Sequence, residues 1–153
     1  MDLTKETIKA LSWKEPYGTL MLYGKIETRI WRTNYRGLVL ICASKKSYCI
    51  DDVLDISPSG FMDIWNIFKI DPNDFNWDSY NLFKRAGKAF AIGNLVDCRP
   101  MKPEDEEKAF VKYYPDLYSW IFEDVKAIQS FPWKGSLGMR FLTQEEKQKI
   151  ILI

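Results

Sequence analysis

The sequence predicts an α+β fold in which about five or six strands close into a small β-barrel with flanking helices. Segments rich in β-branched and aromatic residues recur along the chain and are separated by glycine, proline and asparagine, which is typical of strands joined by turns. Hydrophobic residues make up 46% of the 153 residues, enough for a packed core without disulfides or metals. We therefore expect a single domain over residues 1–153.

The strands follow from local composition. They are expected at residues 8–13, 25–31, 38–43, 89–98 and 117–128, with a final strand after a loop at 131–142. The run LVLICA at 38–43 is apolar throughout, which indicates a strand buried on both faces or inside a barrel. Gly93 interrupts the strand at 89–98 and indicates a bulge or a close backbone approach.

Helix signals occupy segments between the strands. Residues 15–24 combine Pro16 in the first turn with Gly24 at the position of a C-cap glycine. Residues 102–114 begin with a proline and a run of acids, which the helix dipole favours. A variable helical insertion is expected at about 46–88, and it contains an amphipathic pattern at 60–70.

Composition bears on the setting of the protein. No apolar run reaches the roughly 20 residues of a membrane-spanning helix, and the N-terminus lacks the layout of a signal peptide. The three cysteines are an odd number, which argues against a disulfide framework and favours a reducing cytoplasm. Their spacing does not suit zinc, and no P-loop or dinucleotide fingerprint is present. We expect a cytoplasmic protein without metal, cofactor or membrane contact.

The net charge of +1 is unevenly distributed. Residues 25–46 carry six basic side chains against one acid, whereas residues 51–80 carry seven aspartates and one lysine. The basic stretch favours an anionic partner such as nucleic acid. The acidic stretch is either a solvated insertion or a surface for a protein partner.

Alternation along the strand at 25–31 concentrates polar groups on one face. Lys25, Glu27, Arg29 and Trp31 share that face, and the opposite face, at residues 26, 28 and 30, is expected to enter the core. The polar face is either a solvated line of ion pairs, which contributes roughly 0–1 kcal/mol per pair, or a ligand site.

In a ligand site, these side chains would recognise a phosphate and a base. Arg29 would grip a phosphate or a base edge, and Trp31 or Tyr35 would stack on a ring. Glu27 would hold Arg29 or accept a hydrogen bond from an exocyclic amine. With no histidine in the chain, a lysine, tyrosine or carboxylate would have to serve as any general acid or base.

Short motifs follow one another from residue 10 to residue 45. They are Leu11-Ser12, Glu15-Pro16-Tyr17, Gly24, Lys25, Glu27-Thr28-Arg29-Ile30-Trp31, Tyr35-Arg36-Gly37 and Ala43-Ser44-Lys45. This succession closely resembles the start of ASCH domains (activating signal cointegrator homology) of the PUA-like superfamily. The sequences AIGNLVDC at 91–98 and PWKGSLG at 132–138 are also similar to that family.

The resemblance implies a PUA-like barrel with a cleft that binds RNA or a modified nucleoside. Lys25, Glu27 and Arg29 match the signature positions of the family, and Trp31, Tyr35 and Lys134 would form the rims. The chain departs from the family pattern in three places: two residues are missing between the glycine and the glutamate, a Gln-Pro-Trp element is Glu-Pro-Tyr, and a histidine is replaced by Cys42.

The resemblance also leaves two catalytic alternatives open. Some small relatives are amidohydrolases of N4-acetylcytidine that use a lysine, a threonine and a glutamate, and another has been described as a ribonuclease. The threonine nucleophile corresponds to Glu27 here, and Thr28 is expected on the opposite face. Lys25 and Glu27 are therefore the candidates for any catalytic role.

The sequence thus predicts one ligand site for RNA, a nucleoside or a nucleotide. Its residues are Lys25, Glu27, Arg29, Trp31, Tyr35, Ser44 and Lys134, with Arg36 and Lys45 on backbone phosphates. Phosphate contacts of this kind would make binding weaken as the salt concentration rises.

Overall fold

The computed structural model describes residues 2–46 and 85–153. Most of the expected insertion at about 46–88, with the pattern at 60–70 and the acidic segment at 51–80, lies outside the described residues. In chain order the elements are η1 (Leu3–Lys5), β1 (Ile8–Trp13), α1 (Tyr17–Leu20), η2 (Met21–Tyr23), β2 (Glu27–Arg29), β3 (Gly37–Ala43), β4 (Lys88–Pro100), η4 (Pro103–Asp105), α4 (Glu106–Ala109), β5 (Tyr118–Pro132), β6 (Arg140–Phe141) and α5 (Gln144–Gln148).

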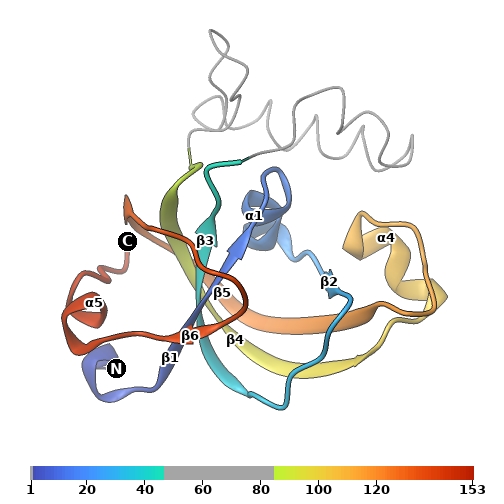
Figure 1. Cartoon of the computed structure of the whole chain (residues 1–153), viewed down its shortest axis with the longest axis horizontal. Coiled ribbons are helices and arrows are strands. Elements are labelled where there is room, and N and C mark those ends of the chain that lie inside the picture. Colours follow the sequence, from blue (N-terminus) through green and yellow to red (C-terminus); the bar gives the residue numbers. More distant parts are fainter. Residues whose placement is uncertain (1, 47–84) are drawn as a thin grey trace, which may run out of the picture.

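These strands form one curled sheet in the order β2-β5-β4-β3-β1-β6. Figure 1 shows β4 and β5 as long curved ribbons that sweep past the shorter strands. Every pair is antiparallel except β1 with β3, which is parallel. The mixed α+β class is confirmed.

The expected closure into a barrel is wrong for the described residues. The sheet is a half-barrel, and its edge strands β2 and β6 do not pair with each other over residues 2–46 and 85–153. Since β2 has three residues and β6 has two, neither edge offers a ladder long enough to close the sheet.

Most strand positions are confirmed. The segment 8–13 matches β1, 38–43 lies within β3 and 89–98 lies within the longer β4. The segment 117–128 begins one residue before β5, which starts at Tyr118. The strand expected at 25–31 is shorter, because the chain bends at residues 30 and 31.

The helical segments are shorter than expected. Residues 15–24 contain α1 and η2 and end at Gly24, whose φ of 85° confirms the C-cap. The helix expected at 102–114 ends at Ala109, because Phe110 adopts a φ of 57°. The unexpected α5 begins with a capping box opened by Thr143. Within the described ranges, none of the helices combines the length and apolar character that crossing a bilayer requires.

The prediction that residues 38–43 are buried on both faces is confirmed in its main part. Odd-numbered residues of β3 enter one hydrophobic cluster with Trp13 and Trp120, and even-numbered residues enter a second cluster with Ile8. The expected irregularity at Gly93 is also confirmed. The β4–β5 register shifts there, and a Cβ atom on this glycine would lie 2.9 Å from a methyl group of Val125.

An ion pair between Arg99 and Asp105 stabilises one end of the sheet. Arg99 donates two hydrogen bonds to Asp105, whose carboxylate also accepts from Ser119 and from the Lys102 backbone N–H. The Arg99 hydrogen bond is the main reason that the pKa of Asp105 is lowered far below its ordinary value of 3.8. This cluster holds η4 and α4 against the end of β4 and β5, whereas α5 lies near both termini at the opposite end (Figure 1).

We expect Asp105→Asn to destabilise the fold by about 2–3 kcal/mol at neutral pH, because Arg99 loses a buried charged partner. A carboxyl group with a depressed native pKa stabilises the protein above its unfolded pKa of about 4. That contribution disappears as the pH falls through the native pKa. Urea unfolding measured from pH 7 to pH 2 should show a weaker acid dependence for the variant than for the wild type. An identical slope in both would contradict this assignment.

Candidate functional site

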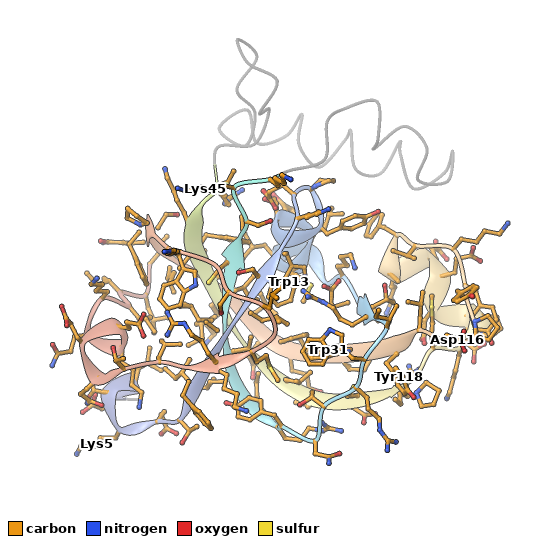
Figure 2. All side chains as sticks on the ribbon, viewed as in Figure 1. Lys5, Trp13, Trp31, Lys45, Asp116 and Tyr118 are labelled. Carbon is orange, nitrogen blue, oxygen red and sulfur yellow. The ribbon has the colours of Figure 1, made fainter. Side chains whose placement is uncertain are left out.

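A cleft of about 550 Å³ opens beside β2. The parallel pairing of β1 and β3 brings the ends of both strands to one edge, so that Ser12 and Ser44 border the same space. The remaining walls come from β2, from Tyr17 in α1, from Val111 after α4 and from residues 136–138 in the loop before β6. Figure 2 shows Trp13, another wall residue, in the middle of the curled sheet.

A chain of charged hydrogen bonds runs along the floor of the cleft. Lys25 Nζ donates to Glu27 Oε1 at 3.0 Å and to the Ile26 carbonyl oxygen at 2.8 Å. Arg29 Nε donates to Glu27 Oε2 at 2.9 Å, and Arg29 Nη2 donates to the Ser12 carbonyl oxygen at 2.8 Å. Arg29 therefore links the edge strand β2 to β1 and has a fixed orientation.

Burial separates the roles of the three side chains. The side chain of Lys25 is 0% exposed and that of Glu27 is 7% exposed, whereas that of Arg29 is 21% exposed. Burial lowers the pKa of Lys25, although Glu27 partly opposes this effect. Burial alone would raise the pKa of Glu27, but the neighbouring Lys25 and Arg29 outweigh it and the pKa falls below its ordinary value. Of these three side chains, Arg29 is the one whose charge a ligand can reach.

Aromatic rings flank both cations. The Arg29 guanidinium lies 5.2 Å from the centre of the Trp13 ring, and Lys25 Nζ lies 5.1 Å from the centre of the Tyr17 ring. Cations at such distances from aromatic faces gain roughly 0.5–2 kcal/mol. Trp13 Nε1 is buried and has no hydrogen-bond acceptor among the described residues.

Four of the predicted site residues meet in this cleft: Lys25, Glu27, Arg29 and Ser44. The sequence also predicted Trp31 in this site, but Trp31 does not line the cleft. Its ring packs edge-on against Trp120 with ring centres 4.7 Å apart, and its carbonyl oxygen accepts a hydrogen bond from the Trp120 indole. Trp31 thus anchors the bend after β2 to the core.

Tyr35 and Arg36 border a different cavity, of about 750 Å³. Its wall includes Leu38 and Ile92, which belong to the second hydrophobic cluster and so lie on the other face of the sheet. The Tyr35 hydroxyl donates to the Leu38 carbonyl oxygen at 2.7 Å. The structure does not bring these two predicted residues to the cleft beside β2.

Lys45 and Lys134 are exposed and lie outside the lining of the cleft. The stem of Lys45 covers Gly87 at the turn before β4, and Figure 2 places Lys45 well away from Trp31. Lys134 precedes the loop residues 136–138 that do line the cleft.

The expectation for the second face of β2 is wrong. Ile30 is 78% exposed instead of entering the core, because the strand ends at Arg29. Thr28 was expected to point away from the site, yet it lines the same cleft as its neighbours. Since β2 is a three-residue strand paired only with β5, alternation along it does not separate a core face from a ligand face.

Sequence reasoning missed Ser12, Trp13 and Tyr17 as site residues. The topology of the sheet would have identified Ser12 and Trp13. If the strand at 8–13 runs parallel to the buried strand at 38–43, both strands end at the same edge, and residues 12 and 13 lie next to Ser44. Spacing along a single strand carries no such information.

No protein-family model matches the chain, and no curated protein is significantly similar to it in sequence.

Removal of Glu27 and removal of Arg29 should lower the stability of the protein by different amounts. We expect Glu27→Ala to lower the free energy of unfolding by about 3–5 kcal/mol, because it leaves Lys25 buried without its carboxylate. Arg29→Ala should cost about 1–2 kcal/mol, since Glu27 keeps Lys25 as a partner. Urea unfolding measures both, with the exposed Arg32→Ala as a control within about 0.5 kcal/mol of the wild type. Equal losses for Glu27→Ala and Arg29→Ala would refute this order.

Proposed function

We propose that the chain is a PUA-like domain of the ASCH kind that binds single-stranded RNA, or a nucleoside from it, in the cleft beside β2. The proposal rests on one observation. The guanidinium of Arg29 is held by Glu27 and by the Ser12 carbonyl oxygen, yet remains partly exposed in a cleft with aromatic walls. A fixed, weakly hydrated cation of this kind suits recognition of phosphates and base edges.

The size and walls of the cleft support a nucleoside. Its volume of about 550 Å³ falls within the range of roughly 300–1,000 Å³ that small-molecule sites occupy. Tyr17, Val111 and Leu137 contribute apolar surface, whereas Trp13 is 2% exposed and belongs to the core. Leu137 is fully exposed at the loop tip, where it has no packing role in the described fold. Flat rings can be covered by such surfaces, and stacking contributes about 1–3 kcal/mol per base.

Backbone phosphates would lie at the rim of the cleft. Lys14 lines the cleft, Lys45 is exposed just beyond the end of β3, and Lys134 is exposed in the adjoining loop. Sequence reasoning also assigned Arg36 to a phosphate, but Arg36 borders the other cavity. An RNA molecule bound in the cleft would have to pass around the sheet to contact it.

Arg29→Ala should weaken binding of a fluorescein-labelled single-stranded RNA octamer by about 10-fold or more, as expected for loss of a charge-assisted contact. Fluorescence anisotropy at low salt measures the affinity. Lys126→Ala is the matched control, because it removes one positive charge from the cavity on the other face and should change the affinity less than about threefold.

Wild-type binding should also weaken with salt, since each phosphate contact contributes about 0.7 to the slope of log affinity against log salt. The absence of RNA and nucleoside binding even at low salt would overturn the proposed function. An equal loss of affinity in Arg29→Ala and Lys126→Ala would show that the RNA does not bind specifically in the cleft.

Hydrolysis of a modified nucleoside is the second candidate, and the position of Thr28 favours it. Thr28 lines the same cleft as Lys25 and Glu27, which supplies the residue types of a lysine–threonine–glutamate amidohydrolase. Burial lowers the pKa of Lys25, which is the direction that turns a lysine into a base. Thr28 would attack the acetyl carbonyl carbon and pass its proton to the base. The bond between that carbon and N4 would then break as the base returns the proton to N4, and cytidine would leave an acetyl ester on Thr28. Water would then release acetate from the acyl-enzyme.

Incubation with N4-acetylcytidine tests this alternative by chromatography of the released cytidine. If the protein is an amidohydrolase, Thr28→Val should lower turnover by about 100-fold or more, because it keeps the shape of the side chain and removes the nucleophile. Ser136→Ala is the control, as it removes another hydroxyl from the cleft wall and should leave turnover unchanged. Absence of cytidine with the wild-type protein eliminates this activity.

A further inference from the structure

The carboxylate and the carbonyl oxygen that contact Arg29 accept hydrogen bonds from side chains of the protein. Both oxygens of Glu27 accept charged hydrogen bonds, one from Lys25 and one from Arg29. The Ser12 carbonyl oxygen accepts from Arg29, and the Trp13 carbonyl oxygen accepts from Ser44. A ligand that presents an amino group to Arg29 would therefore face a positive charge without a free carboxylate nearby.

Donors remain available on Arg29. A guanidinium has five N–H groups, and Arg29 donates two of them, from Nε and from Nη2. Nε and Nη2 share one edge of the planar guanidinium, so with that edge committed to Glu27 and Ser12 the end of the group keeps one outward N–H on each of Nη1 and Nη2. Neither has an acceptor in residues 2–46 and 85–153. The two are parallel, and the contacts to Glu27 and Ser12 fix their direction.

Two fixed parallel donors select a partner with two adjacent acceptors in one plane. Guanine offers O6 and N7 in this arrangement, whereas adenine offers N7 beside an amino group. In single-stranded RNA the Watson–Crick edge is also free, and cytosine there offers O2 and N3 as a second pair of adjacent acceptors. Uracil carries an N–H at N3 between its two carbonyl oxygens and offers no such pair. Guanine and cytosine therefore match the uncommitted edge of Arg29, and adenine and uracil do not.

A phosphate also presents two oxygens, but the walls distinguish it from a base. Tyr17, Val111 and Leu137 line the same cleft as Arg29, and Leu137 is fully exposed with an apolar surface. A base in contact with Arg29 can cover such surface with its ring. A phosphate would lose hydration against the same apolar surface without gaining a contact from it.

On these grounds we propose that the cleft selects guanine over adenine and uracil, with Arg29 donating to O6 and N7 and Glu27 holding Arg29 in position. This inference rests on the proposed function. It also changes the part assigned to Glu27: its carboxylate orients the arginine and does not bind an exocyclic amine.

The wild-type protein tests the proposal directly with hexamer RNA probes. Each probe is a fluorescein-labelled hexauridine with a single central guanosine, inosine, 7-deazaguanosine or adenosine. Anisotropy should give equal affinity for guanosine and inosine, which both keep O6 and N7. Affinity should fall by about threefold or more for 7-deazaguanosine, which lacks N7, and by about 10-fold or more for adenosine.

Arg29→Lys supplies a second test, because it keeps one positive charge and removes the paired donors. The variant should bind the guanosine and adenosine probes equally, while the salt dependence of its binding stays as in the wild type. Arg29→Ala, which removes the charge, tests for a phosphate contact: a salt slope reduced by about 0.7 in that variant would assign Arg29 to a phosphate and overturn the proposal. A melting curve confirms that the variant is folded.

The outcomes separate the two proposals. Equal wild-type affinity for all four probes overturns guanine selection and leaves RNA binding intact. Absence of binding to every probe, and to the RNA octamer, overturns both.

Discussion

The buried carboxylate of Glu27 is the constraint on which the geometry of the cleft depends. It is nearly inaccessible and lies between two cations, one of them fully buried. A buried ammonium without a partner would be strongly destabilising, so Lys25 can occupy its position only while Glu27 remains ionised. The second oxygen of the same carboxylate fixes Arg29, whose other contact is a backbone carbonyl on β1. One anion therefore both permits the buried lysine and orients the exposed arginine across two strands.

The curled, open sheet determines where this arrangement can meet a ligand. Because β1 and β3 run parallel, their ends lie together, and the Ser44 N–H donates to the Trp13 carbonyl oxygen at 2.7 Å. The short edge strand β2 stands opposite, joined to the rest of the sheet through β5 alone. A closed barrel would pair β2 with the other edge strand, β6, and so fill the space beside β2 with paired backbone. The half-barrel leaves that space as a cleft, and a side-chain contact from Arg29 spans it.

The strand β3 could be predicted from the sequence because it is apolar throughout, as burial on both faces requires. The sequence also identified Lys25, Glu27, Arg29 and Ser44, since their clustering is local along the chain or depends on one strand end. Trp31 and Tyr35 were assigned to the site because cations and rings near each other in sequence suggest a shared face. Tertiary contacts decide otherwise: Trp120 binds Trp31 from a strand that is remote in sequence, and the Tyr35 side chain turns back to the start of β3. The open edge of the sheet depends on the lengths of β2 and β6, which are set by bends and glycine turns that local composition does not encode.

The same contacts that favour recognition oppose catalysis by Lys25. A general base must reach the proton that it removes, and here the lysine nitrogen is fully buried with hydrogen bonds to Glu27 and to a backbone carbonyl. Proton transfer to or from a substrate would require at least one of these contacts to break, at a cost of about 1–3 kcal/mol for each charged hydrogen bond. Arg29 needs no such rearrangement, because its outward N–H groups are uncommitted and already oriented. The site is therefore prepared to bind in its resting geometry, whereas chemistry at Lys25 requires a second geometry in which the ammonium leaves Glu27.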